Sequence, residues 1–563
     1  MNSGEEVVVR FLMKRFFNPS EYGWVCGDNH VHPQHDPAAT IKADDSYAIV
    51  QALGNGLDFL TINAKSSSPI IQKSKSIVVT HTPEIGFGMF TGHFNVIGAS
   101  EFKKEPGILP AQKLVAEVHA RGGAVVYTHP LHPPTQLHHM GATEAFSDAV
   151  LGRCADAFDV HNRQEEALWF MLLNLGNRMA VSSSTDATLE RPQTHAPGDY
   201  RVYVQAKSPT WKQIAGAVRQ GRTFATNGGP VYVFFDIDGK LPGARIPTAP
   251  DKKHLATIQV ASRFPLKSLE IIRNGQVIKR FQKGSKGMRR FSWKFKEGEK
   301  AWYVARVEDQ NSNWAISSPV YLMPRKRQRR LPSAFVLLEI GNFIGRCQLS
   351  RRFCAHVMVT TYGSCIGKVE VRRNDRLIRA KIPADGNQMV DGQIPVTGIP
   401  GREYKEGWGW HPHEGRANHF QMDLPIEESG WYQILAYAKD GRVIKSDRVY
   451  FDSAFPKSQQ MTSANLFAGN HRFSLRGYGE DTPLNEISSA ILDLKKHQWT
   501  PRHDHWWFPH KACWEIKAVF DGQVAYHEFV DGLPPSAQFH MQPTSPRRRT
   551  KRNEIHLRRF QPG

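Results

Sequence analysis

The alternation of strand-like and helix-like segments stops near Pro230, and this change of pattern constrains the fold more than any other feature of the chain. Before Pro230, short apolar runs alternate with helically spaced ones, as in an α/β domain. The segment 44–53, for example, has helical spacing and stops at Gly54-Asn55-Gly56, and the apolar run 57–62 follows it. After Pro230 only short strands separated by turns are predicted. The sequence therefore predicts an α/β domain followed by a long all-β region.

A motif rich in histidine lies at the start of the α/β region. His30 and His32 are separated by one residue in GDNHVHPQHD and follow the apolar residues 24–26. In a strand both imidazoles leave the same face, where they can share one cation. His35 and Asp36 follow as further metal-competent side chains. A single His-x-His pair is more typical of hydrogen-bonded structural histidines, so the motif needs support from elsewhere in the chain.

Metal-competent side chains also stand at the ends of four later apolar segments. Glu84 lies in the turn-rich segment 81–86, and His93 opens the segment 93–98. His129 and Asp186 each end an apolar strand. Catalytic groups of α/β barrels collect at the carboxyl ends of the strands. We therefore expect these side chains to meet His30 and His32.

The order of these motifs resembles a known family. GDNHVH, GLDFLTI, Glu84 with GHFNVIG, GGAVVYTHP, STDA and GRTFATNGGP follow one another as in the polymerase-and-histidinol-phosphatase (PHP) superfamily, and are most similar to its CehA/McbA-type metallohydrolases. The resemblance covers roughly residues 22 to 230. It implies a distorted (β/α)7 barrel that binds up to three metal ions and hydrolyses phosphoesters or, in this branch, some carboxylic or carbamate esters.

The resemblance also implies roles for individual residues. One divalent cation would be held by His30, His32, Glu84 and Asp186. A second would be held by Glu84, His93 and His129. His129 and Asp186, together with Lys65, would also take part in catalysis. Imidazole and carboxylate ligands suit Zn²⁺, Mn²⁺ or Fe²⁺, and the sequence does not choose among them.

Two positions depart from the family pattern. An Asp-His pair usually closes the strand that follows Gly56, and here Ala64 and Lys65 stand there. The last motif usually reads Asp-x-His, and here Thr188 takes the place of the histidine. The Lys65 ammonium could replace a cation and hold an anionic substrate oxygen. We therefore expect one or two metal ions, or a site that has lost catalysis.

The all-β region contains an internal repeat. The segment 269–278 parallels 369–378, each a strand, a tight turn and a second strand, and Trp302-Tyr303 parallels Trp431-Tyr432. This repeat predicts two Ig-like β-sandwich domains, at 231–324 and 335–453, joined by a basic linker at 325–334. The other expected units are a lead-in strand or β-domain remnant at 1–21, an uncertain aromatic-rich β region at 454–542 containing His503 and His505, and a disordered basic tail at 543–563.

Composition limits the partners. The net charge is +20, from 73 Lys and Arg against 53 Asp and Glu, but much of the excess lies in the basic linker and the tail. Such runs are usually solvated, so nucleic acid is disfavoured as a partner. The six cysteines show neither zinc-ribbon nor disulfide spacing. No transmembrane segment or signal peptide is predicted, so a cytoplasmic location follows by default, or a secreted one if the natural N-terminus lies upstream.

Two functions remain open from the sequence. The first is a metal-dependent hydrolase that acts on a small-molecule or anionic ester substrate through a metal-activated water. The second is a non-catalytic binding protein with a degenerate metal site and β-sandwich interaction modules. The departures at Lys65 and Thr188 favour the second function. The retention of six ligand-type side chains favours the first, because converging polar groups are costly to bury.

Overall fold

The computed structural model describes 21 stretches of the chain, and the structural statements below concern these residues. They are 6–10, 16–34, 43–63, 68–71, 77–85, 93–99, 111–130, 155–190, 195–281, 284, 286–324, 335–342, 354–362, 366–381, 417–426, 428–451, 462–468, 471–476, 513–520, 523–531 and 554–560. The described helices include none that is long and apolar enough to cross a bilayer.

The α/β region begins with a sheet centred on β2 (Trp24–His32). Strands β3 (Phe59–Asn63) and β5 (Val78–Thr82) continue it in parallel, and β11 (Arg201–Gln205) pairs with its other side in antiparallel orientation. The remaining members are β4 (Ser68–Ile71), β10 (Ala187–Thr188) and β12 (Thr223–Thr226). The predicted helix before β3 is α1 (Asp45–Gly54), which the Asp44 side chain caps by accepting a hydrogen bond from Tyr47 N at 2.8 Å.

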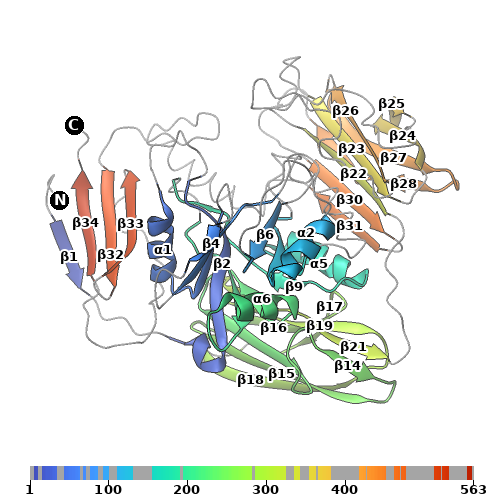
Figure 1. Ribbon diagram of the computed structural model, residues 1–563. Helices are drawn as coiled ribbons and strands as arrows, with labels where there is room; N and C mark the ends of the chain where they lie inside the picture. Colours follow the sequence, from blue (N-terminus) through green and yellow to red (C-terminus); the bar gives the residue numbers. More distant parts are fainter. Residues whose placement is uncertain are drawn as a thin grey trace.

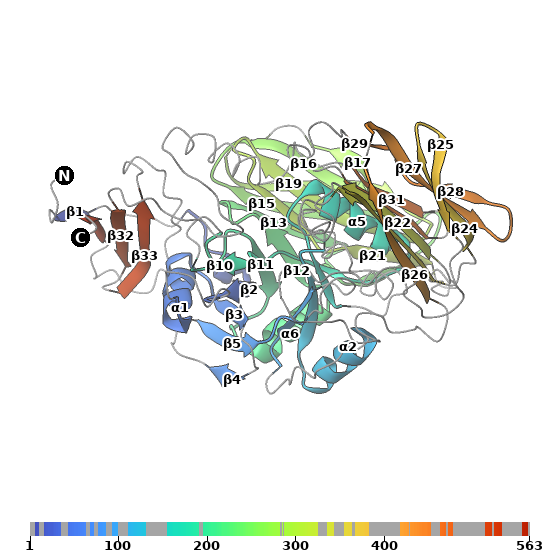
Figure 2. The same cartoon turned by 90° about the horizontal axis from the view of Figure 1, so that it is seen from above.

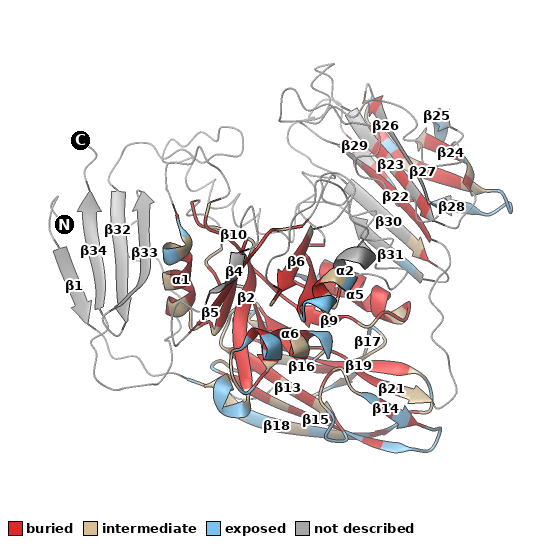
Figure 3. Cartoon of the chain, viewed as in Figure 1, coloured by how far each residue is buried: buried red, intermediate tan, exposed pale blue. Residues whose placement is uncertain are grey.

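A second sheet faces the first. Its order is β6 (His93–Ile97), β7 (Ala124–Thr128), β8 (Ala157–Asp159) and β9 (Ala180–Ser182), with β7, β8 and β9 parallel and β6 antiparallel to β7. The helices of this half are α2 (Ala111–Ala120), α5 (Arg163–Asn174) and α6 (Trp211–Arg219). Small apolar side chains fill the space between the sheets, including Val25, Val78, Val126, Ala157, Ala180 and Val202. Burial is dense through this half of the molecule (Figure 3).

The described strands do not form the distorted (β/α)7 barrel that the resemblance implies, because the two sheets meet at two seams without a continuous ladder. At one seam a single bridge joins Ile85 to Phe94. At the other, two hydroxyl groups replace the ladder: Val181 N donates to Ser318 Oγ at 2.8 Å, and Thr223 Oγ1 donates to Val181 O at 2.6 Å. The two hydroxyl oxygens lie 2.6 Å apart, so Ser318 can donate to Thr223 and complete the chain of hydrogen bonds.

The first β module is a sandwich that shares a sheet with the α/β region. One layer contains β13 (Val231–Ile237), β15 (Lys253–Ser262) and β18 (Gly287–Lys296). The other contains β14 (Arg245–Thr248), β16 (Leu266–Arg273), β17 (Gln276–Arg280), β19 (Ala301–Asp309), β20 (Trp314–Ser317) and β21 (Val320–Pro324). Because β20 pairs with β12, with Phe224 opposite Ser317, one 13-stranded sheet runs through both units. The sheet therefore continues across the predicted boundary near 230.

The second β module is also a sandwich, and it extends beyond the predicted end at 453. One sheet has the order β26 (Ala417–Pro425), β23 (Cys354–Tyr362), β22 (Phe335–Asn342), β30 (Thr462–Ala468) and β31 (His471–Arg476). The other has β25 (Arg376–Lys381), β24 (Ile366–Arg373), β27 (Gly430–Ala438) and β28 (Val443–Lys445), with β29 (Val449–Phe451) beside β27. Val357 and Ile434 are among the buried residues of its core.

The two ends of the chain lie side by side in a separate sheet. Strand β1 (Glu6–Arg10) pairs antiparallel with β34 (Glu554–Phe560), and the sheet continues through β32 (Cys513–Phe520) to β33 (Gln523–Asp531) (Figures 1 and 2). The expected lead-in strand thus joins the C-terminal region, and part of the tail expected to be disordered forms a strand. The basic linker 325–334 and the pair His503 and His505 lie outside the described residues.

Candidate metal centre

The structure brings together all six side chains that the sequence analysis named as metal ligands. His30 and His32 project from the end of β2, and Glu84 follows β5 by two residues. His93 opens β6, whose direction is reversed, so it lies at the same edge as the carboxyl ends of the parallel strands. His129 directly follows β7, and Asp186 lies four residues beyond β9. Strand direction alone explains why ligands so distant in sequence converge.

The donor atoms form three overlapping groups. The first contains His30, His32 and Glu84, the second His30, His129 and Asp186, and the third Glu84, His93 and His129, with the donor atoms of each group within 4.8 Å of one another. His30 Nε2 lies 2.9 Å from His32 Nε2 and 3.2 Å from Asp186 Oδ1. His30 therefore links the first two groups.

Glu84 links the first and third groups through its two oxygens. Its Oε2 lies 3.3 Å from His32 Nε2, and its Oε1 lies 2.5 Å from His93 Nδ1 and 3.1 Å from His129 Nε2. A carboxylate in this position can serve two neighbouring cations, one through each oxygen.

Two of the six residues have unusual backbone conformations. The φ angle is +25° at His129 and +50° at Asp186. Residues other than glycine rarely adopt positive φ, and such conformations cost on the order of 1–3 kcal/mol each. Surrounding contacts must hold them, and for Asp186 these come from Asp28. The Asp28 carboxylate accepts hydrogen bonds from Thr185 N at 3.2 Å and Gly198 N at 2.9 Å, which fixes the turn that carries Asp186.

Sequence reasoning missed Asp28, although it lies inside the histidine motif. Its side chain is fully buried, and burial raises the pKa of this carboxyl group to about 6, although hydrogen bonds from Thr185, Gly198 and His30 act in the opposite direction. Asp28 lies two residues before His30, and this spacing was the available signal for a supporting role.

A chain of buried hydrogen bonds orients His30. His30 Nδ1 lies 2.9 Å from Thr128 Oγ1, which donates to Asp159 Oδ2 at 2.9 Å. Ser184 Oγ also donates to Asp159 Oδ2. Because the Thr128 hydrogen is committed to Asp159, Thr128 accepts from His30 Nδ1–H. In the neutral imidazole Nε2 then presents a lone pair to the centre, as a metal ligand requires.

The electrostatics of the cluster follow from burial and close opposite charges. Burial disfavours the charged form of His32, but Asp186 and Glu84 outweigh this effect and raise its pKa to about 10. For Glu84 and Asp186, burial favours the neutral form, but the neighbouring histidines hold both pKa values well below the usual range. For His129, burial dominates and lowers the pKa. The two carboxylates therefore stay ionised and attract a cation or a proton.

Thr188 and two further histidines have different surroundings. Thr188 lies in β10, paired with His32 in the sheet. His161 contacts Glu165 and the Ser184 carbonyl, and His119 contacts Asp156. Lys65, His35 and Asp36 lie outside the described residues, as do three histidines of the segment after His129, namely His132, His138 and His139. Thr128 and Asp159 were not assigned the supporting role that the structure gives them.

Comparisons with known proteins add little. No family profile and no curated protein matches this sequence. Among solved structures, a complex of endonuclease Q with a 27-mer duplex containing an abasic lesion is 16% identical over 35% of this chain, with a TM-score of 0.28. The lesion-specific endonuclease PfuEndoQ from Pyrococcus furiosus is likewise 16% identical over 35% of this chain, with a TM-score of 0.26. The match spans only 56% of either endonuclease chain.

A third match concerns the β-rich part. Fibronectin(III)-like modules of Clostridium thermocellum CbhA are 12% identical, over 38% of this chain and 92% of theirs, with a TM-score of 0.13. These likenesses are to a mixed α/β domain and to β-rich modules, as the fold itself shows. At such TM-scores they carry no argument about function, which has to rest on the geometry of the site.

Proposed function

We propose that this chain is a metal-dependent hydrolase that acts on a phosphoester or a carboxylic or carbamate ester. His30, His32, Glu84 and Asp186 would hold one divalent cation, and Glu84, His93 and His129 a second. The observation that carries the proposal is the convergence of these six donors, from five separate segments, on one edge of the two sheets. Both carboxylates stay ionised there, and Thr128 directs His30 Nε2 into the cluster.

The donor set fits a transition metal. Imidazole and carboxylate ligands suit Zn²⁺, Mn²⁺ or Fe²⁺, and the Thr128–Asp159 support of His30 is the outer-shell arrangement typical of metal-bound histidines. A bound ion of this kind supplies a Lewis acid, lowers the pKa of a coordinated water and polarises the ester oxygen. The position of Thr188, where the resemblance has histidine, favours one or two ions over three.

The residues themselves indicate the side from which the substrate approaches. The side chain of His30 is completely buried, whereas that of Asp186 is 34% exposed, the most of the six clustered side chains. Asp186 Oδ1 faces His30 and His32, and Oδ2 lies 3.9 Å from His129 Nε2. We assign Asp186 and His129 to the substrate side. There the carboxylate can accept a proton from the attacking water, and the imidazole can orient the ester.

Metal content tests the proposal directly. Protein purified without chelator should contain one or two transition-metal ions per chain by elemental analysis, and the double variant His30→Ala, His32→Ala should lose them. His119→Ala is the matched control, because His119 lies on α2 in contact with Asp156. A metal-free wild-type protein that also fails to bind added Zn²⁺, Mn²⁺ or Fe²⁺ would contradict the proposal.

A non-catalytic binding protein is the second candidate. The departures at Lys65 and Thr188 favour it, as does Trp431 on the second β module, a residue that is 49% exposed. Activity of the metal-loaded protein separates the two. Turnover of any aryl phosphate, carboxylic ester or carbamate that disappears in Asp186→Asn supports the hydrolase. Full metal occupancy without turnover of all three classes supports the binding protein.

A further inference from the structure

The two β modules are structurally equivalent at the turn and strands that the sequence repeat indicates. In the first module, Asn274 N donates to Trp302 O at 3.1 Å and Trp302 N donates to Asn274 Oδ1 at 2.9 Å. In the second, Asn374 and Trp431 form the same two bonds, at 2.9 and 3.0 Å. A further pair also matches, since Ala305 N donates to Ser317 Oγ and Ile434 N to Ser446 Oγ, each at 2.9 Å. Strand β28 is therefore the equivalent of β20.

In the first module this region is covered by the α/β domain. Strand β12 pairs antiparallel with β20, placing Ala225 opposite Ile316. Trp302 is only 4% exposed, its ring lies 5.1 Å from that of Phe170, and its Nε1 donates to Asn174 Oδ1. The equivalent edge and face are therefore an interface inside this molecule.

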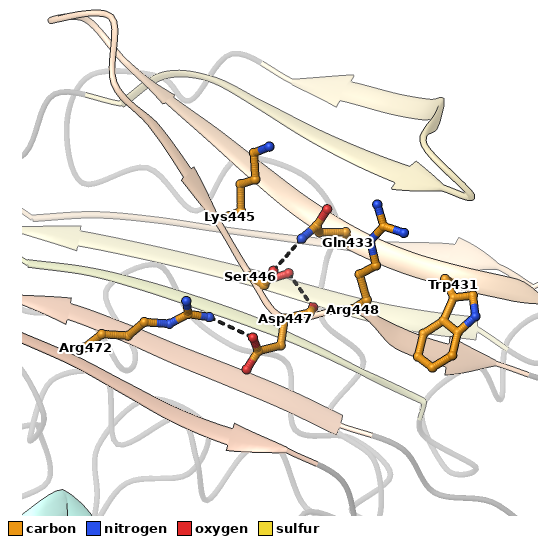
Figure 4. Close-up of a pocket in the computed structure, with 7 residues that line it drawn as sticks. All are labelled: Trp431, Gln433, Lys445, Ser446, Asp447, Arg448 and Arg472. Carbon is orange, nitrogen blue, oxygen red and sulfur yellow. Dashed lines mark hydrogen bonds and ion pairs between the residues drawn. The ribbon is translucent and has the colours of Figure 1, made fainter.

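In the second module no described strand pairs with the equivalent edge, which is called the open edge below. Among the described strands, β28 pairs only with β27 and ends its sheet. The side chains have changed in character: Gln433 stands in the position of Val304, Lys445 in that of Ile316, and Trp431 remains as the equivalent of Trp302. A pocket of about 400 Å³ lies here, lined by Trp431, Gln433, Lys445, Ser446, Asp447, Arg448 and Arg472 (Figure 4).

The open edge can accept another strand. Ser446 N donates to Ile434 O, and Ala438 N donates to Arg442 O, so residues 442 and 446 direct their peptide groups toward β27. In an antiparallel pair this direction alternates from one residue to the next. The N–H and C=O groups of Val443 and Lys445 therefore face away from β27, as the peptide groups of Ile316 face β12 in the first module.

The charge of the pocket selects an acidic occupant. Three cations line it, namely Lys445, Arg448 and Arg472, against one carboxylate, Asp447. Arg472 contacts Asp447 at 2.7 Å and Arg448 contacts Asp375 at 2.6 Å, while the described residues give Lys445 no ion pair. Lysine on an edge strand opposes pairing with basic or purely apolar strands, and it attracts strands that carry carboxylates.

We propose that β28 and the pocket beside it form a docking site for an extended acidic segment of a partner protein. The segment adds to β28 as an antiparallel strand, in the way that β12 adds to β20. Its carboxylates face Lys445 and Arg448, and one of its side chains covers Trp431. Because β12 has four residues, a segment of about that length fits the edge. This site is separate from the candidate metal centre and does not depend on the proposed hydrolase activity.

A peptide library tests the proposal on the full chain. Immobilised protein is panned against random linear 12-residue peptides, and the affinity of enriched peptides is measured by fluorescence anisotropy. Enriched peptides should carry Asp or Glu at alternate positions and lack proline. Lys445→Glu and Trp431→Ala should each weaken binding about tenfold or more. The matched control is Arg376→Glu, which makes the same charge change on β25 at the opposite edge of the sheet and should leave affinity within about twofold.

Val443→Pro tests the backbone contact. It removes an N–H that faces away from β27, so the module keeps its own ladder while the added strand loses a partner, and binding should again fall about tenfold. Thermal melting checks that each variant is folded. If Val443→Pro does not fold, the affinity of Lys445→Glu tests the proposal instead. Equal affinity of wild type, Lys445→Glu and Trp431→Ala would overturn the proposal. The proposal would also fail if Lys445→Glu lost binding while folded Val443→Pro kept it, because that result indicates a simple anion site. It would fail as well if the wild type sedimented as a dimer that Val443→Pro dissociates, because the edge would then pair with a second copy of the chain.

Discussion

Thr128 shows how a residue without metal-binding ability can control the candidate centre. It stands between His30 and Asp159, and it fixes which imidazole nitrogen carries the proton. Glu84 and Asp186 then face a nitrogen that is available for a cation. The ligands supply the donor atoms, and the hydroxyl group of Thr128 orients one of them, His30.

Removing that hydroxyl should weaken metal binding without removing any ligand. We expect Thr128→Val to lower metal affinity about 10- to 100-fold, because His30 loses the partner of its Nδ1. Competition with a metal-binding dye measures the change. Thr80→Val is the control, since Thr80 is equally buried and, among the described residues, its hydroxyl has one hydrogen-bond partner, Thr61 at 3.5 Å. Equal losses in both variants would show that the effect is general destabilisation.

His161 should make stability depend on pH. Burial disfavours its charged form, but the charge and hydrogen bond of Glu165 outweigh burial, with help from Asp159 and the Ser184 carbonyl, and raise its pKa to about 9. The folded-state pKa thus exceeds the unfolded value of 6.5. The resulting stability is fully present below pH 6.5 and is lost as the pH rises through 9. It amounts to about 3 kcal/mol.

Urea unfolding of wild type and His161→Gln at pH 6 and pH 10 measures this contribution. The difference in unfolding free energy between the two proteins should be large at pH 6 and small at pH 10. A difference that is the same at both pH values would mean that His161 acts only through packing.

At the scale of elements, the two seams between the sheets set the shape of the α/β region. The bridge between Ile85 and Phe94 and the hydroxyl pair of Thr223 and Ser318 hold the sheets where ladders are missing. Ser318 belongs to the first β module, so this module supplies one of the groups that closes the domain carrying the metal centre.

Ser318→Ala should therefore destabilise the α/β region. It leaves the buried Val181 N–H without its acceptor, at a cost of about 1–3 kcal/mol. Ser292→Ala is the control, because Ser292 is exposed on β18 and the same change there should be close to neutral. Chemical denaturation of both variants gives the comparison. A Ser318→Ala protein as stable as wild type would show that the seam does not depend on this hydroxyl.

The sequence predicted the strand ends well and the contacts between sheets poorly. His30, Glu84 and His129 could be placed together because strand direction brings them to one edge. The roles of Thr128 and Asp28 depend on partners up to 170 residues away, and neither periodicity nor spacing shows such pairings. The pairing of β12 with β20 could not be predicted, because an edge strand and a continued strand have the same sequence pattern.

At the scale of the whole molecule, a chain shortened to end at Pro324 should keep the metal centre. None of the proposed ligands lies beyond Asp186, and the β12–β20 pairing is retained. The metal content of this chain should equal that of the full chain. A chain ending at Pro230 is the counterpart. It exposes the edge of β12 and the face of α5 around Phe170, and we expect it to be insoluble. A folded chain ending at Pro324 that cannot bind metal would place a ligand in the C-terminal half.

The pairing of β12 with β20 also governs how the protein loses its structure on heating. A hydrogen-bonded sheet that passes from the α/β region into the first β module cannot melt on one side while the other stays intact without exposing a buried edge. These two units should therefore unfold cooperatively, as a single calorimetric transition. Any ion held at the metal centre then protects strands of the β module that it never touches, because its binding energy is shared by the whole cooperative unit.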